Sequence, residues 1–220
     1  MLNGKLKGKK IDSSGVNSEF CRPTSSNVAQ IFFNTINGNS CYSGLFSNSV
    51  TFVDLFAGTG RIGFDALGLG CGKVVFIEKN SSAISKIKEN AKTLLLDDVC
   101  SFFQKDVYRS IDWVFENATS KESDNIIFFD PPYKEIDEFF ELISKLIKAQ
   151  IIFTNIPLLV GEFNYALFKK YTLGKLSLRI DKKIENSELV GLFKRLFDCE
   201  LDVKLKQISS DKGLIFIQKQ

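Results

Sequence analysis

Short apolar runs alternate with amphipathic segments along most of the chain. Short apolar runs bounded by glycine or charged residues predict buried strands of a parallel sheet. These runs cover residues 50–56, 73–77, 99–103, 126–129 and either 158–163, which we prefer, or 151–153. Between them, apolar residues recur every three or four positions, the period of an amphipathic helix. The predicted helices cover residues 61–69, 81–96, 107–117 and 135–148.

The two ends of the chain follow other patterns. Residues 1–11 alternate loosely and predict a short bent strand or hairpin, and a helix follows with Val28, Ile31, Phe32 and Ile36 on its apolar face. Residues 165–200 are rich in lysine and arginine and predict extra helix or an insertion. Alternating residues on both sides of a Ser-Ser-Asp-Lys-Gly turn predict an antiparallel hairpin over residues 201–217.

The order of strands and helices favours an α/β fold with a doubly wound, mostly parallel sheet that ends in an antiparallel hairpin. We expect an N-terminal extension over residues 1–49 and a main domain over 50–220, with an insertion at 165–200. Ligands of such sheets bind beyond the carboxyl ends of the strands. The chemically informative residues fall at those ends, at 58–60, at Glu78 and at 130–133.

Composition narrows the class of protein. The 220 residues are 44% hydrophobic and 25% charged, which is ordinary for a soluble globular protein. No apolar run approaches the roughly 20 residues that cross a bilayer, and the first residues do not read as a signal peptide. Histidine is absent, which excludes the Ser-His-Asp triad, the Cys-His dyad and the HExxH zinc site. We expect no metal site.

The five cysteines are scattered and form no CxxC pair, which argues against a zinc ribbon or a thioredoxin-type site. We interpret them as buried thiols of a protein in a reducing cytoplasm. The net charge is only +3, yet residues 1–10 carry four lysines and no acid: Lys5, Lys7, Lys9 and Lys10. Such a segment suits a polyanion, although a solvated terminus is the interpretation that the segment alone favours.

A glycine turn follows the first predicted strand. Gly58, Gly60 and Gly63 have the spacing GxGxxG, and Glu78 follows Gly58 by twenty residues, where an acid can bind ribose hydroxyls. Asp54 at the end of the strand would repel a pyrophosphate but can bind an ammonium group. These residues therefore favour S-adenosylmethionine over a dinucleotide. Asp106, after the third strand, can accept a hydrogen bond from adenine or cap the next helix.

The segment Asp130-Pro131-Pro132-Tyr133 directly follows the fourth strand. Two prolines make this loop stiff and rich in hydrogen-bond acceptors. We expect a planar base to stack on Tyr133 while its amino group bonds to the Asp130 carboxylate and the Pro131 carbonyl. Fixed acceptors can aim the amine lone pair at an electrophilic methyl group without a histidine base. A rigid turn with a packed tyrosine is the simpler alternative.

Three motifs, DLFAGTG, FIEKN and FDPPY, resemble the Rossmann-like class I methyltransferases that modify exocyclic amines. The N-terminal NGKLKGKK, Arg22-Pro23-Thr24 and Phe33-Asn34 narrow the resemblance to the RsmD-type enzymes, which methylate N2 of a guanine in bacterial 16S rRNA. The family commonly has charged residues where this chain has Ser26, Asn27, Ala29 and Gln30.

The resemblance implies specific roles for individual residues. Asp130, Pro131, Pro132 and Tyr133 would hold the guanine amine. The cofactor S-adenosyl-L-methionine would be bound by Thr24, Asp54, Ala57, Gly58, Gly60, Glu78 and Asp106. The basic N-terminus and Arg22 would contact 16S rRNA within an assembling 30S particle, and the enzyme would be a cytoplasmic monomer. The alternatives are a DNA-adenine or protein-glutamine methyltransferase, or a cofactor-binding assembly factor without activity.

Overall fold

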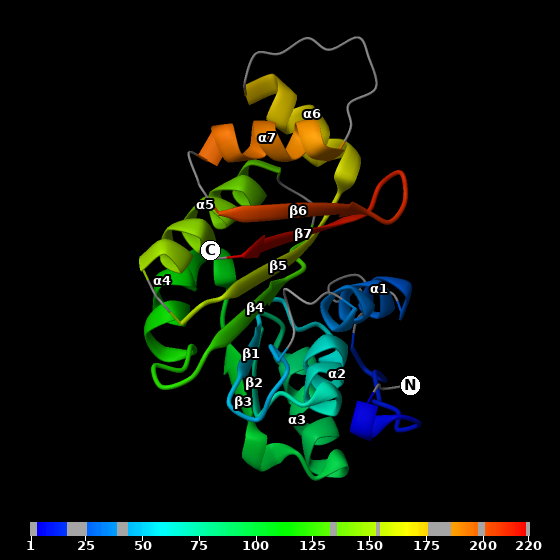
Figure 1. Ribbon diagram of the computed structural model, residues 1–220. Coiled ribbons are helices and arrows are strands. Elements are labelled where there is room, and N and C mark those ends of the chain that lie inside the picture. Colours follow the sequence, from blue (N-terminus) through cyan, green and yellow to red (C-terminus); the bar gives the residue numbers. More distant parts are fainter. Residues whose placement is uncertain are drawn as a thin grey trace. The chain divides into compact units, whose positions relative to one another are not determined.

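The computed structural model describes residues 4–16, 26–38, 44–132, 136–152, 155–175, 186–197 and 201–218 (Figure 1). The chain forms two compact units, Met1–Phe128 and Phe129–Gln220. The boundary between these units differs from the one expected after residue 49. The expected boundary separates an N-terminal extension from a main domain and stays a prediction.

Four parallel strands form the sheet of the first unit: β1 (Thr51–Asp54), β2 (Lys73–Glu78), β3 (Cys100–Gln104) and β4 (Asn125–Phe129). Their order is β3-β2-β1-β4, because β1 pairs with both β2 and β4, and β2 also pairs with β3. All residues of β1 and β4 are buried, which agrees with the continuous apolar runs that predicted them. The sequence thus predicted all four strands and their parallel arrangement.

The helices of the first unit are α1 (Ser26–Asn37), α2 (Arg61–Leu69), α3 (Ser81–Leu94) and α4 (Val107–Asn117), with a 3-10 turn η3 (Asp97–Val99) before β3. Figure 1 shows α2 and α3 on one side of the strands and α4 on the other. The Asn80 side chain caps α3 by accepting a hydrogen bond from the Ala83 amide. Glycine at residue 70 ends α2 with its amide bonded to the Ala66 and Leu67 carbonyls.

The strand or hairpin predicted near the N-terminus is wrong for the described residues 4–16. Gly4–Leu6 form a 3-10 turn, η1, in which the Lys7 amide donates to the Gly4 carbonyl at 3.0 Å. The φ of Gly4 is +58°, which does not continue a strand. Leu6 is buried, so the segment attaches through one apolar side chain rather than through an alternating face.

The second unit contains an antiparallel sheet of β5 (Leu158–Phe163), β7 (Gly213–Gln218) and β6 (Asp202–Gln207), in that order. The preferred position of the fifth strand and the C-terminal hairpin are both confirmed. Helix α5 (Ile136–Ile152) runs four residues beyond its predicted end. Near that end the buried Gln150 donates to the carbonyls of Ile156 and Ile217, at 3.1 and 3.0 Å.

Residues 165–200, for which the sequence predicted either extra helix or an insertion, contain α6 (Tyr165–Lys175) and α7 (Asn186–Phe197). The two helices pack together (Figure 1), and a set of aromatic rings joins them to α5. Phe140 of α5 lies 3.9 Å from Tyr171 and 5.3 Å from Phe168, between ring centroids. Phe168 continues the set to Phe193 of α7 at 5.6 Å. Within the described residues, no helix has the length and apolar character to span a bilayer.

Candidate functional site

The predicted cofactor residues that the structure describes gather at one edge of the first unit's sheet. Because the strands are parallel and Asp54 pairs with Phe76 while Glu78 pairs with Gln104, their carboxyl ends lie side by side. Asp54 ends β1 and is 2% exposed. Glu78 ends β2, and Asp106 follows β3 by two residues. One edge therefore presents three carboxylates beside the glycine turn.

The glycine turn joins β1 to α2. Gly58 and Gly60 have φ angles of +54° and +78°, which favour glycine, and the Gly60 amide donates to the Ala57 carbonyl at 2.7 Å. Gly60 also occupies the N-cap of α2, where no side chain caps the first amides. A Cβ at Gly63 would lie 2.3 Å from the Phe76 ring. The third glycine thus permits close packing of helix against strand, as the spacing predicted.

Glu78 is already part of the backbone network. Its Oε2 accepts a hydrogen bond from the Gly58 amide and its Oε1 accepts one from the Asn80 amide, both at 2.8 Å. The carboxylate therefore ties the glycine turn to the start of α3. A carboxylate has about four lone-pair positions, so acceptor capacity remains for ligand hydroxyls.

Asp106 occupies the N-cap position of α4, but its side chain makes no capping hydrogen bond. The capping alternative is therefore wrong for the side chain. The carboxylate instead forms an ion pair with Lys79 at 2.7 Å and a longer one with Arg109 at 4.0 Å. Sequence reasoning missed Lys79, because the pair joins residues that follow different strands.

Two aromatic rings beside these carboxylates were also missed. Phe56 of the loop after β1 and Tyr108 in the first turn of α4 are both half-buried. Their ring centroids lie 5.5 Å apart with planes inclined by 56°. The signal was present, since each aromatic residue stands two positions after a predicted site residue, Asp54 or Asp106.

The remaining predicted residues are distributed as follows. Asp130 is half-buried, Pro131 is buried and Pro132 is exposed; these three belong to the second unit and directly follow β4 in the chain. The four N-terminal lysines are exposed. The predictions at Arg22, Thr24 and Tyr133 lie outside the described residues.

The model of a family described as "Conserved hypothetical protein 95" matches residues 1–188. The chain belongs to this family. The resemblance to the RsmD-type enzymes is confirmed by a relative from Haemophilus influenzae named "Ribosomal RNA small subunit methyltransferase D". It is 29% identical over 196 residues, which cover 82% of this chain and 91% of the relative. The YlbH protein of Bacillus subtilis is 31% identical over 61% of this chain and 67% of its own length.

Solved structures agree with the fold. The yhhF protein of Escherichia coli matches with a TM-score of 0.62 and 16% identity, over 100% of this chain and 97% of that one. The METTL16 MTase domain matches with a TM-score of 0.61 and 14% identity, over 96% and 74% of the two chains. These likenesses confirm the predicted Rossmann-like class I methyltransferase fold.

The residues of the first unit fit the cofactor that this family and fold generally use, S-adenosylmethionine. Its ammonium and hydroxyl groups need acceptors, and the edge offers the carboxylates of Asp54 and Glu78. The cofactor has a positively charged sulfonium group and contains no phosphate, so three acids at one edge would not repel it as they would repel a pyrophosphate. The two left-handed glycines leave the turn without side chains where a ligand approaches the backbone.

Proposed function

We propose that this protein transfers a methyl group from S-adenosylmethionine to the exocyclic N2 of a guanine in bacterial 16S rRNA, at a G966-type site. One observation carries the proposal: three carboxylates and the glycine turn gather at the carboxyl edge of the first unit's sheet, in a chain of this methyltransferase family. The relative from Haemophilus influenzae, named as a methyltransferase of small-subunit rRNA, supports the substrate class.

Each residue at this edge has a proposed part in cofactor binding. Asp54 accepts hydrogen bonds from the cofactor's ammonium group, and Glu78 accepts them from the ribose hydroxyls. Asp106 accepts one from the adenine amine, which requires the exposed Lys79 ammonium to share this carboxylate. Ala57, Gly58 and Gly60 provide a backbone surface without bulky side chains, and Thr24 contributes from the N-terminal segment.

The Asp-Pro-Pro-Tyr segment has the proposed part of holding the guanine amine. When bound, the cofactor supplies an electrophilic methyl group on a sulfonium sulfur. The Asp130 carboxylate and the Pro131 carbonyl accept the two amine hydrogens, while Tyr133 stacks on the base. Asp130 and Pro131 would thus direct the nitrogen lone pair at the methyl group that the bound cofactor supplies, and the nitrogen would release one proton to complete the transfer. Positioning and electrostatics supply the rate enhancement, so no histidine is needed.

The test compares three kinds of methyl acceptor and one matched pair of protein variants. Radiolabelled methyl transfer is measured on unmodified 30S particles, on naked DNA and on protein. We expect labelling of 16S rRNA alone. Asp130→Ala should lose activity by about 100-fold or more while cofactor affinity is kept, because its target is the amine. Asp112→Ala, at an exposed acid of α4, should leave both unchanged. Label in DNA or protein, or full activity of Asp130→Ala, would contradict the proposal.

A further inference from the structure

The N-terminal segment Gly4–Asp12, here called the basic arm, is anchored to the first unit at two places. The first anchor is η1, which packs on α2 and buries Leu6 to 8% exposure. Gly4 lies so close to α2 that a Cβ there would be 1.9 Å from the Gly68 carbonyl oxygen. Any larger residue at position 4 must therefore displace this end of the arm.

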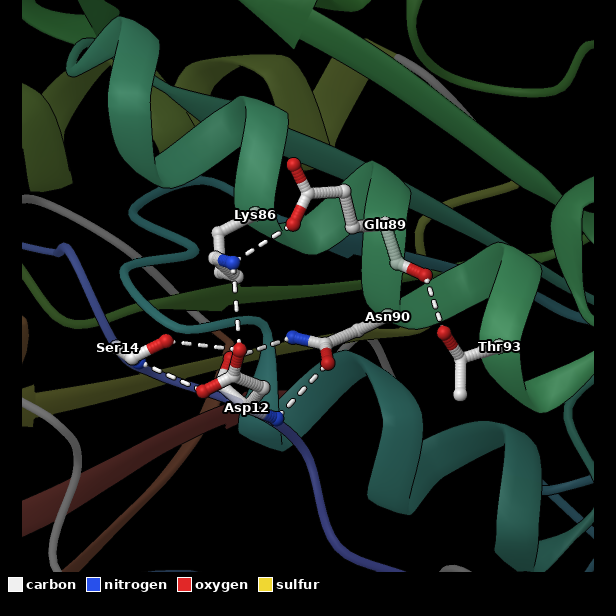
Figure 2. A network of polar contacts seen from close by, with 6 residues as sticks. All are labelled: Asp12, Ser14, Lys86, Glu89, Asn90 and Thr93. Carbon is white, nitrogen blue, oxygen red and sulfur yellow. Dashed lines mark hydrogen bonds and ion pairs between the residues drawn. The ribbon is translucent and has the colours of Figure 1, made fainter.

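The second anchor is a reciprocal pair of hydrogen bonds between Asn90 of α3 and the backbone of Asp12 (Figure 2). The Asp12 amide donates to Asn90 Oδ1, and Asn90 Nδ2 donates to the Asp12 carbonyl, both at 2.8 Å. The side-chain amide thus pairs with the main chain as a neighbouring strand would. Asn90 is only 5% exposed, so its position is well fixed.

The carboxylate of Asp12 is engaged at the same anchor (Figure 2). It accepts hydrogen bonds from the Ser14 amide and hydroxyl, each at 2.8 Å, and forms an ion pair with Lys86 at 3.3 Å. The Ser14 hydrogen bonds, assisted by Lys86, lower the pKa of Asp12 below its ordinary value. The nearest acid in the chain is therefore committed to α3 and the turn at Ser14, not to the lysines of the arm.

The arm carries four lysines, and all are exposed: Lys5 lies in η1 itself, and Lys7, Lys9 and Lys10 lie between the two anchors. In the described part of the chain, none of them forms an ion pair with a carboxylate. Residues 1–11 contain no acid. The fold thus holds four lysines without an ion-paired carboxylate, among the described residues, in one anchored segment. An unanchored terminus would instead leave these lysines mobile. Fixing cations before binding reduces the ordering that a polyanion must impose.

We propose that Asn90 and Gly4 are positioning residues for RNA binding. They hold the basic arm on α3 and α2 so that its lysines meet consecutive phosphates of the rRNA as one surface. This inference rests on the proposed rRNA substrate. It adds that affinity for RNA depends on two residues that touch no RNA themselves.

The first test releases the Asp12 anchor. Asn90→Ala should weaken binding to an unmodified 16S rRNA transcript by about tenfold, since ordering of the arm is then required on binding. A plot of the logarithm of the RNA-binding constant against the logarithm of salt concentration has a negative slope. For every phosphate that the arm no longer neutralises, this slope should become less steep by roughly 0.7. Affinity for the cofactor should stay unchanged. The matched control is Asn117→Ala, because Asn117 is exposed and its side-chain amide donates to the Trp113 carbonyl of its own helix.

The second test releases the other anchor, at η1. Gly4→Ala meets the Gly68 carbonyl, whereas Gly8→Ala meets nothing within 4 Å, and both glycines have positive φ, at +58° and +88°. The two variants therefore carry similar backbone strain and differ in how closely the new methyl group approaches α2. Gly4→Ala should weaken RNA binding as Asn90→Ala does, and Gly8→Ala should weaken it much less.

A double substitution separates positioning from general loss of structure. In a variant with all four arm lysines changed to glutamine, adding Asn90→Ala should cause no further loss of RNA affinity. A further tenfold loss in that background, or unchanged RNA affinity of Asn90→Ala and Gly4→Ala, would overturn the inference. Failure of the wild-type protein to bind or methylate 16S rRNA would instead contradict the proposed function, so the two failures are distinguishable.

Discussion

Glu78 has a part in the fold in addition to its proposed part in cofactor binding. Its two carboxylate oxygens accept the amides of Gly58 and Asn80, and these bonds connect the glycine turn with the start of α3. The residue was predicted from its position after the second strand, but the two amides were not. Such bonds depend on how the loops fold back, which a linear pattern does not contain.

Glu78→Ala should therefore lower the free energy of unfolding as well as cofactor affinity. We expect a loss of about 1–3 kcal/mol in urea denaturation, because two backbone amides lose their acceptor. Glu116→Ala, at an exposed acid of α4, should change stability by less than about 0.5 kcal/mol. Equal stability of the two variants would show that the two hydrogen bonds contribute nothing to folding.

Cys71 and Cys100, the two cysteines in the described residues, are free thiols at the amino ends of β2 and β3. Burial raises the pKa of each from 9.0 to about 12, with a smaller contribution from Asp97 at Cys100. Cys71 is buried, as the sequence indicated, whereas Cys100 is only half-buried. Cys21, Cys41 and Cys199 lie outside the described residues.

Alkylation by iodoacetamide should reveal these raised pKa values. At pH 8 both thiols should react about a thousandfold more slowly in the folded protein than in urea, as measured by peptide mass spectrometry. A raised thiol pKa stabilises the fold fully below pH 9, and this contribution declines as the pH rises from 9 toward 12. Equal rates in the folded and unfolded chain at pH 8 would contradict the burial of these residues.

At the scale of elements, the sequence predicted those with a strong period and failed where tertiary contacts decide. Helices α2 and α4 have their predicted bounds, since each has a clear apolar period between strands. The N-terminal strand was wrong because Gly4 adopts a positive φ against α2, a contact with no trace in local alternation. Asn90 was overlooked, yet a polar residue three positions after Ile87 and four before Leu94 interrupts an apolar face and could have been noticed.

The close packing of α2 on β2 gives a prediction at this scale. Gly63→Ala places a Cβ 2.3 Å from the Phe76 ring, so we expect a loss of about 1–3 kcal/mol in stability. Gly191→Ala in α7 meets nothing within 4 Å and should instead stabilise its helix by about 0.5–1 kcal/mol. Thermal unfolding of both variants measures the difference, and a stable Gly63→Ala protein would contradict the packing.

At the scale of the whole molecule, the sequence predicted the candidate site better than its connections. Parallel strands alone place Asp54, Glu78 and Asp106 at one edge, so their gathering followed from the strand pattern. The Lys79–Asp106 ion pair and the anchoring of the basic arm could not be predicted in this way. Each joins residues that are far apart in the sequence and that meet only in the folded chain.

The proposed function requires methylation of one guanine in 16S rRNA. The most direct measurement is mass spectrometry of 16S rRNA fragments from a strain without this gene. We predict the loss of one N2-methylguanosine, its return with the wild-type gene, and no return with the Asp130→Ala gene. An unchanged set of methylated guanines in the deletion strain would contradict the proposed guanine-N2 methylation of 16S rRNA.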